Sequence, residues 1–179
     1  MNTWKPSPKE LRAARDKTIP DVITGGLDVI FCGINPSLYS AAVGHHFARP
    51  GNRFWPTLHG AAYTDRLLSP FEDHLLLDFG CGLTNMAARA TARADELSVD
   101  ELEDGAHKLE KKLKRHRPGC IAFLGITAYR SAFGRPKAVI GRQKERIADV
   151  PVSVLPNPSG LNAHYQLPEL VSLYRELRG

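Results

Sequence analysis

The sequence predicts an α/β protein with a largely parallel central sheet. Three short apolar runs, each ended by a glycine or proline turn, are typical of strands buried on both faces. They are Asp28–Ile34, Cys120–Gly125 and Val150–Leu155. Segments with apolar residues at helical spacing lie between these runs, and strands that alternate with helices favour a parallel sheet. The 179 residues suffice for one core, so we expect a single domain over residues 21–179, preceded by a basic segment, residues 1–20.

The N-terminal half contains two further segments with helical signals. Pro8 is placed to open a short helix over Lys9–Lys17, either as a solvated helix or as a basic arm near phosphates. A helix that begins within Arg53–Tyr63 would bury Phe54 and Trp55. A second helix is expected over Pro70–Phe79, ended by Gly80. The intervening stretch, Asn35–Asn52, is expected to be a long loop, and such loops in compact domains are usually functional or disordered.

The C-terminal half contains the clearest helix. Ser98 and Glu101 form a capping box, and the helix from Ser98 to Arg117 has one apolar stripe. That stripe comprises Val99, Leu102, Ala106, Leu109 and Leu113. The other elements expected are a strand or turn at Gly82–Met86, a helix at Ile126–Phe133, a loop or edge hairpin at Gly134–Asp149 and a final helix at Leu167–Leu177.

Composition and motifs exclude several classes of protein. No apolar run approaches the roughly 20 residues that span a bilayer, and the N-terminus carries no secretory signal, so we expect a cytoplasmic, bacterial protein without membrane contact. The three cysteines lie far apart, so no disulfide framework is predicted, and Cys32 and Cys120 are expected as packing residues. The formal net charge of +5 permits a polyanionic partner.

The common signatures of cofactor and metal chemistry are missing from the sequence. It contains neither a GxGxxG nor a Walker motif for a nucleotide, and no GxSxG nucleophile elbow. His45 and His46 are adjacent in the chain, so they cannot easily chelate one metal ion, and no third ligand follows at a convincing spacing. We therefore predict neither a cofactor nor a metal site.

Two of the predicted strands end in similar sequence motifs, GINPS at Gly33–Ser37 and LPNPSG at Leu155–Gly160. In a parallel sheet both ends lie at one edge, where ligands of open α/β sheets bind. Asn35 would stand at this edge with Pro36 behind it. Taken alone, the Asn-Pro pair is better explained by an ordinary turn, because such turns are common.

Together these motifs resemble the mismatch-specific uracil/thymine DNA glycosylases of the uracil-DNA glycosylase superfamily. The resemblance extends from about Lys17 to Leu177 and includes LDVIFCGINPSL, GHHFARPGNRFW, CGLTNM and LPNPSGL. It implies a three-layer α/β/α sandwich with a short, mainly parallel sheet. It also implies a monomeric enzyme that flips uracil, or thymine or ethenocytosine, out of mismatched double-stranded DNA and hydrolyses its N-glycosidic bond.

The resemblance assigns roles to individual residues. Asn35 would position the attacking water, and since an amide accepts protons poorly, Asp95 is a candidate general base or else a surface acid. Phe47 would stack on the flipped base, although a core phenylalanine is the alternative. The other residues expected to line the base pocket are Ile34, His46, Asn85, Thr91 and Asn157.

The second motif resembles a loop that enters the duplex. Leu161 would wedge between bases, while the backbone near Ser159 and Gly160 would face the unpaired guanine, with Pro158 in the same DNA-binding turn. An ordinary turn with one exposed leucine is the alternative. Some family members carry a basic residue where this chain has Ala163, so the preference for guanine stays open.

Two other functions are compatible with these residues. One is a DNA-damage binding protein with weak catalysis, and the other is a glycosylase for another base, such as hypoxanthine. Because the matched motifs contain no catalytic lysine, we expect no β-lyase activity.

Overall fold

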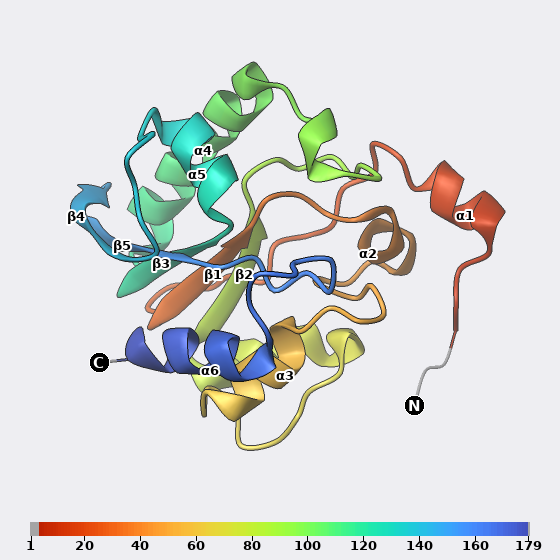
Figure 1. Cartoon of the computed structure of the whole chain (residues 1–179), viewed down its shortest axis with the longest axis horizontal. Helices are drawn as coiled ribbons and strands as arrows, with labels where there is room; N and C mark the ends of the chain where they lie inside the picture. The colour runs from red at the N-terminus through yellow and green to blue at the C-terminus, as the bar shows by residue number, and fades with distance from the viewer. Residues whose placement is uncertain (1–3, 179) are drawn as a thin grey trace.

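The computed structural model describes residues 4–178, which form a three-layer α/β/α sandwich (Figure 1). Within these residues a five-stranded sheet has the order β2-β1-β3-β5-β4. The strands are β1 Val29–Gly33, β2 Cys81–Asn85, β3 Cys120–Leu124, β4 Gly141–Ile147 and β5 Val150–Leu155. Strands β2, β1, β3 and β5 run parallel, and only β4 is antiparallel to its neighbour. The fold class predicted from the sequence is confirmed.

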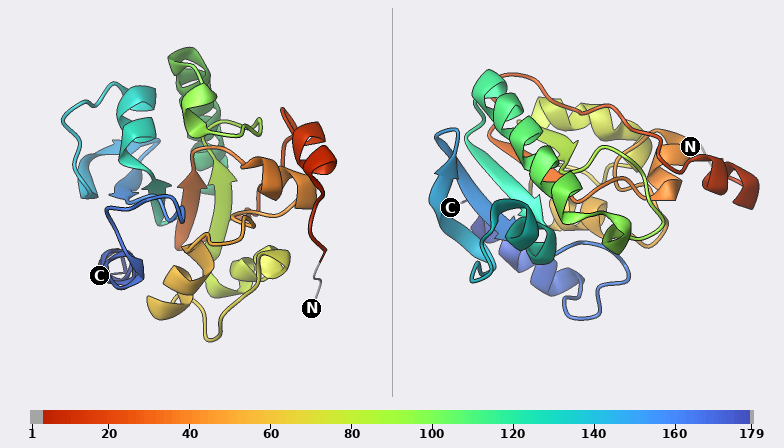
Figure 2. Two further views of the ribbon diagram at one scale, coloured as in Figure 1. Left: turned by 45° about the vertical axis from the view of Figure 1, so that its right-hand side comes forward. Right: turned by 90° about the horizontal axis from the view of Figure 1, so that it is seen from above.

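Two hydrophobic cores lie on opposite faces of the sheet because side chains alternate along each strand. In β1, Ile30 and Cys32 face one core, whereas Val29 and Phe31 face the other. The first core is covered by α4 (Val99–His116) and α5 (Ile126–Phe133). The second is covered by α3 (Phe54–Gly60), the 3₁₀ helix η1 (Pro70–Phe79) and α6 (Leu167–Glu176). Figure 2 shows the sheet between these two helical layers.

Helix α4 follows its sequence signals closely. The predicted capping box forms, and Leu102, Leu109 and Leu113 are buried against the sheet. The assignment of Val99 to the apolar stripe was wrong, because this first residue of the helix is 54% exposed. It stands beyond the part of the helix that covers the sheet.

Three other expectations need correction. The segment predicted as a continuous loop contains α2 (Leu38–Val43), which is capped by Ser37 and ends at Gly44 with φ +79°. The N-terminal helix α1 is shorter than expected, Pro8–Ala13, and the chain turns at Asp16 with φ +63°. A short 3₁₀ helix, η2 (Ala94–Glu96), lies in a stretch to which no element had been assigned.

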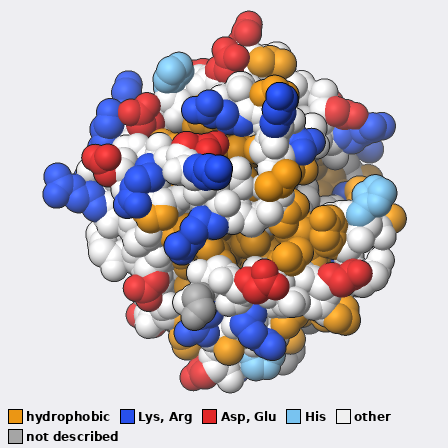
Figure 3. Space-filling view, turned by 60° about the vertical axis from the view of Figure 1, so that its left-hand side comes forward, with side chains coloured by type: hydrophobic (Ala, Val, Ile, Leu, Met, Phe, Trp, Pro, Cys, Tyr) orange, Lys and Arg blue, Asp and Glu red, His pale blue; other side chains and the backbone are white. Residues whose placement is uncertain are grey.

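Two alternatives left open by the sequence are resolved. Gly82–Met86 contributes to the strand β2, and Gly134–Asp149 contains the edge strand β4. Along β4 the exposed side chains are Arg142, Lys144 and Arg146. Charged side chains of this kind discourage pairing with another chain at a free sheet edge. Figure 3 shows the side of the molecule that carries β4, with basic and acidic side chains interspersed around hydrophobic ones.

The four parallel strands end at the same edge of the sheet. Gly33 is opposite Asn85 in the β1–β2 pair, and Leu124 is opposite Leu155 in the β3–β5 pair. The loops that follow β1, β2 and β5 therefore meet above this edge. Among residues 4–178, no helix has the length and apolar character needed to cross a membrane.

Candidate active site

A pocket of about 380 Å³ opens at the carboxyl edge of the sheet. Three loops form most of it: the β1–α3 loop (residues 34–53), the β2–α4 loop (residues 86–98) and the β5–α6 loop (residues 156–166). The pocket brings together ten of the predicted site residues, namely Ile34, Asn35, His46, Phe47, Asn85, Thr91, Asp95, Asn157, Ser159 and Leu161. Pro158 and Gly160 belong to the same β5–α6 loop but do not line the pocket. This volume lies in the range of small-ligand sites.

The side-chain amide of Asn35 is held in one orientation. Its Nδ2 donates to the carbonyl oxygen of Arg89 at 3.0 Å and to Oγ1 of Thr91 at 2.7 Å. The Thr91 hydroxyl donates in turn to the carbonyl oxygen of Arg93 at 2.7 Å. No residue in the described part of the chain donates to Asn35 Oδ1, so this oxygen is left as an acceptor for a water or a ligand.

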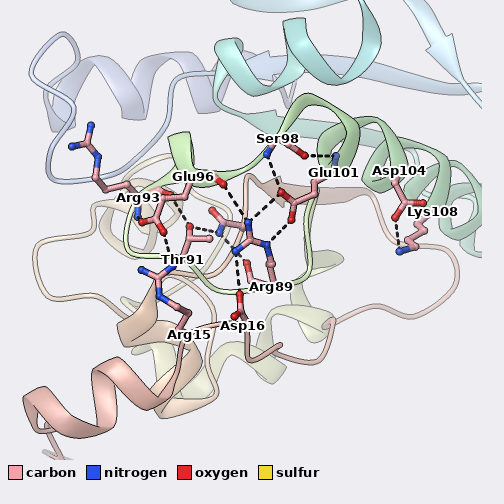
Figure 4. Close-up of polar contacts among 11 residues, drawn as sticks. Arg15, Asp16, Arg89, Thr91, Arg93, Glu96, Ser98, Glu101, Asp104 and Lys108 are labelled. Atoms are coloured by element: carbon pink, nitrogen blue, oxygen red, sulfur yellow. Dashed lines mark hydrogen bonds and ion pairs between the residues drawn. The ribbon is translucent and has the colours of Figure 1, made fainter.

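The loop that anchors Asn35 is fixed by an arginine-centred network (Figure 4). The guanidinium of Arg89 contacts Glu101 of α4 at 2.5 Å and Asp16 of the N-terminal segment at 3.1 Å. Hydrogen bonds from Arg89 and from the Ser98 backbone N–H lower the pKa of Glu101 to about 2. Because the same arginine supplies the carbonyl that accepts from Asn35, the network fixes that amide from a second direction.

The N-terminal segment joins this network at a second point. Arg15 forms an ion pair of 2.6 Å with Glu96 of η2 (Figure 4). Both side chains are partly or largely exposed to solvent, so the pair contributes little to stability on its own. It nevertheless places part of the basic segment beside the rim of the pocket, where Ile19 is a lining residue.

A missing side chain at Gly33 creates room in the pocket. A Cβ at this position would lie 2.6 Å from Oδ1 of Asn85 and 3.3 Å from Cζ of Phe47. Glycine therefore allows an amide and an aromatic ring to approach the end of β1. The Asn85 side chain accepts or donates no hydrogen bond within residues 4–178, so its donor and acceptor are both available to a ligand.

Phe47 occupies a strained backbone conformation. Its φ is +52°, a region that bulky residues rarely adopt and that clusters at functional sites. The flanking amides hold it there: His46 N–H donates to Asp73 Oδ2 at 3.2 Å, and Ala48 N–H donates to Ser40 Oγ at 3.1 Å. The Phe47 ring stacks on Phe54 with 4.1 Å between centroids. The core thus supports this ring as one wall of the pocket.

The two adjacent histidines have different environments. His46 is 2% exposed, and its Nε2–H donates to the carbonyl oxygen of Pro20 at 2.9 Å. Burial lowers the pKa of His46 below its ordinary value of 6.5, so the ring is neutral at pH 7 and Nδ1 is an acceptor. His45 is not a lining residue, and its ring packs edge-on against Phe71 with 5.1 Å between centroids.

Asp95 lies in η2 and lines the rim of the pocket. Its side chain is 64% exposed and forms an ion pair of 2.6 Å with Arg93. The carboxylate is therefore close enough to the pocket to meet a ligand, but a cation already engages it.

The β5–α6 loop forms a turn that presents Leu161 to solvent. Asn157 Oδ1 accepts from Ser159 N–H at 2.9 Å, and Ser159 Oγ accepts from Leu161 N–H at 3.2 Å. Leu161 is 75% exposed, although it also lines the pocket. Single exposed leucines are common on proteins, but this one also lines a pocket that contains several polar side chains.

Arginine side chains are the important site residues that sequence reasoning missed. Arg53 was expected only at the start of a helix, yet it contacts four backbone carbonyls of the β5–α6 loop. One available signal was its place immediately before α3, where Ser, Thr, Asp or Asn would be the usual capping residue. Arg89 and Arg93 carried no such local signal.

Residues 4–178 contain no group of three or more His, Cys, Asp or Glu side chains placed to hold a metal ion. The side chains that line the pocket supply amides, hydroxyls, one neutral imidazole, the guanidinium groups of Arg49 and Arg93, the carboxylate of Asp95 and an aromatic wall. These groups suit the binding of a flat polar ring and the orientation of a water.

The structure thus combines a largely parallel sheet, a pocket at its carboxyl edge and an exposed leucine, Leu161, that also lines this pocket. The family model of the uracil DNA glycosylase superfamily matches residues 20–178, and the chain belongs to this superfamily. Its members are hydrolases that act on DNA.

Comparison with solved structures gives the same fold. The chain is similar to a solution NMR structure described as a "putative Uracil DNA glycosylase" from Methanosarcina acetivorans. The TM-score is 0.60 at 20% sequence identity, and the match covers 92% of this chain and 99% of that one.

Proposed function

We propose that this protein is a monofunctional uracil-DNA glycosylase that acts as a monomer on double-stranded DNA with a preference for G:U mismatches. Thymine and ethenocytosine are further candidate substrates. The observation that carries the proposal is that Asn35 and Leu161, from loops far apart in the sequence, line one pocket. An amide that would hold the attacking water is thereby combined with an apolar residue that would fill a gap in stacked bases.

The hydrogen bonds of Asn35 support its role in hydrolysis. Cleavage of an N-glycosidic bond develops positive charge on the sugar and negative charge on the leaving base. Asn35 Oδ1 would accept a hydrogen bond from the attacking water and orient it toward the sugar. Because an amide takes a proton poorly, the reaction depends on a base that leaves as a stable anion. Uracil meets this requirement better than adenine.

Phe47 and Asn85 support the binding of a flipped base. The Phe47 ring would stack on the base, an interaction worth roughly 1–3 kcal/mol. The Asn85 amide offers both a donor and an acceptor, which matches the alternating groups on the edge of uracil. Ile34, His46 and Thr91 would complete the lining around the base.

The β5–α6 loop supports action on a duplex. Leu161 would enter the space that the flipped nucleotide leaves, while backbone groups at Ser159 and Gly160 would face the opposite guanine. Ala163, within this loop, supplies no charge. The mismatch preference would then depend on backbone contacts rather than on a basic side chain.

Asp95 would act as the general base if its carboxylate left Arg93 when substrate is bound. Replacing Asp95 by asparagine keeps the shape and removes the basic oxygen. Loss of uracil release with unchanged duplex affinity would support this role. Release at the wild-type rate would exclude it.

The test of the proposed function uses labelled duplexes that contain uracil, thymine, ethenocytosine or hypoxanthine, each opposite guanine or adenine. After incubation, hot alkali cleaves the strand wherever a base has been removed. We expect scission at uracil, strongest opposite guanine, and no complex trapped by borohydride. Binding without any scission would identify a damage-binding protein, and scission confined to hypoxanthine would identify a glycosylase for another base.

A further inference from the structure

The side chain of Arg53 connects the β1–α3 loop to the β5–α6 loop. Its Nη1 donates to the carbonyl oxygen of Tyr165 at 2.5 Å. Its Nη2 donates to the carbonyl oxygens of Ser159 at 2.6 Å and Asn162 at 2.8 Å. Its backbone N–H donates to the carbonyl oxygen of Pro158 at 2.9 Å. One residue therefore holds the loop that presents Leu161 on both sides of its tip.

The two loops also touch through their backbones. A Cβ at Gly160 would lie 2.5 Å from the carbonyl oxygen of Gly51, so a side chain at this position would push the loops apart. This close approach needs glycine next to Leu161. The contact with Gly51 is independent of the hydrogen bonds of Arg53 but fixes the same pair of loops.

The position of Arg53 joins the loop to the wall of the pocket. The next residue, Phe54, is buried and stacks on Phe47. The start of α3 consequently supports the aromatic wall on one side and the loop with Leu161 on the other. A shift at Arg53 would change the distance between these two features.

The chemistry of the contacts requires arginine. A guanidinium has a planar fork of five N–H donors, which can reach several carbonyl oxygens at once. A lysine ammonium at the end of a flexible chain cannot reproduce this geometry. The contacts are also charge-assisted, which strengthens each of them relative to a neutral hydrogen bond.

We propose that Arg53 is a positioning residue that holds the β5–α6 loop in its inserting conformation before DNA binds. The proposal rests on the proposed function, because it concerns how Leu161 is delivered into a duplex. A loop that is ordered in advance avoids the ordering cost when the complex forms. Arg53 thus acts through Leu161 and does not itself touch the base.

The first test is a double-mutant cycle. Single-turnover release of uracil from a G:U duplex is measured for the wild type, R53K, L161A and the R53K/L161A double variant. We expect R53K to slow release about tenfold in the wild-type background and less than about twofold in the L161A background. Equal slowing in both backgrounds would show a general structural role and would overturn the proposal.

The second test needs no catalysis. Hydrogen exchange of the backbone amides of Leu161, Asn162 and His164 is compared between the wild type and R53K. We expect exchange at these amides to rise about tenfold in R53K. The matched control is R175K, because Arg175 donates to the carbonyl oxygen of Gly60 at 2.7 Å, away from the β5–α6 loop. Unchanged exchange in R53K would overturn the proposal.

The variant G160A leaves Arg53 in place, so it perturbs the contact between the two loops without changing the residue that precedes α3. G160A should slow release from the duplex as R53K does, because the new Cβ displaces the loop from Gly51. Release at the wild-type rate in G160A would contradict a role for the loop contact. If the wild type released no uracil while exchange still depended on Arg53, the proposed function would fail and the anchoring of the loop would stand.

Discussion

Thr91→Val removes one hydroxyl from the chain of hydrogen bonds that orients Asn35. The Thr91 side chain is 2% exposed, and valine has nearly the same shape, so no cavity is created. Two hydrogen bonds disappear, from Asn35 Nδ2 and to the carbonyl oxygen of Arg93, each 2.7 Å long. At about 0.5–1.5 kcal/mol for each bond, the free energy of unfolding should fall by about 1–3 kcal/mol.

The effect on catalysis should be larger than the effect on binding. Asn35 keeps its bond to the carbonyl oxygen of Arg89, so the side chain remains in the pocket but turns more freely. We expect the single-turnover rate of uracil release to fall by about tenfold or more, because loosely oriented groups lose much of their effect. Duplex affinity, measured by fluorescence anisotropy, should stay within about twofold of the wild type.

Thr91→Ser provides the matched control, since it keeps the hydroxyl and loses only a methyl group. It should restore most of the rate. A role of the Thr91 hydroxyl in orienting Asn35 would be refuted if Thr91→Val released uracil at the wild-type rate, or if Thr91→Ser were as slow as Thr91→Val.

Three further predictions follow from the same structure. Leu161→Ala should slow release from duplex DNA by about tenfold while leaving release from a single strand nearly unchanged, since only the duplex has a gap to fill; equal slowing on both would contradict a wedge. Gly33→Ala should slow release about tenfold or more, because the new Cβ would lie 2.6 Å from Asn85 Oδ1 and displace this amide from its place in the pocket; a normal rate would show that the pocket tolerates it. Because burial lowers the pKa of His46, unfolded chains bind more protons than folded ones just below pH 6.5. The contribution of His46 to the free energy of unfolding, measured with urea, should therefore be fully present above pH 6.5 and be lost below it, by at most about 1.4 kcal/mol per pH unit. His46→Gln should show a smaller decline in the free energy of unfolding between pH 6.5 and 5.5. Identical declines in the wild type and the variant would exclude His46 as the cause.

The strands and the longest helix could be predicted because their signals are local. The apolar run of β1, the Ser98 capping box and the apolar stripe on α4 each lie within a short, continuous stretch of the sequence. Helix α2 was missed because it has only six residues and neither a strong apolar face nor an acidic capping partner. Its signals were a serine before it and a glycine after it.

The site could be predicted only as a set of residues at one sheet edge. The similar motifs around Asn35 and Asn157 indicated that two loops meet at one sheet edge, and both residues line the pocket. Sequence patterns could not show what orients the amide of Asn35, because its partner Thr91 is 56 residues away. The same holds for Arg53, whose side-chain contacts to the carbonyls of the β5–α6 loop join residues 106 to 112 positions apart.

Phe47, which has a role by resemblance, and Asp95, which has one by the chemistry of its carboxylate, lie in different surroundings. Phe47 lies in the pocket wall with a strained backbone, a conformation that sequence patterns do not reveal. Asp95 lies at the rim with Arg93 as its partner, and its role as a base stays a prediction. Neither the ion pair between Arg93 and Asp95 nor the positive φ of Phe47 could be read from the spacing of residues.

The most direct measurement compares uracil release and duplex binding for the wild type and Asn35→Ala. Deleting the amide removes the acceptor for the attacking water but leaves the pocket wall and the β5–α6 loop in place. We expect a loss of at least about a hundredfold in single-turnover rate, with the dissociation constant for a G:U duplex within about threefold of the wild type. Uracil release by Asn35→Ala at the wild-type rate would contradict the role of Asn35 as the residue that positions the attacking water.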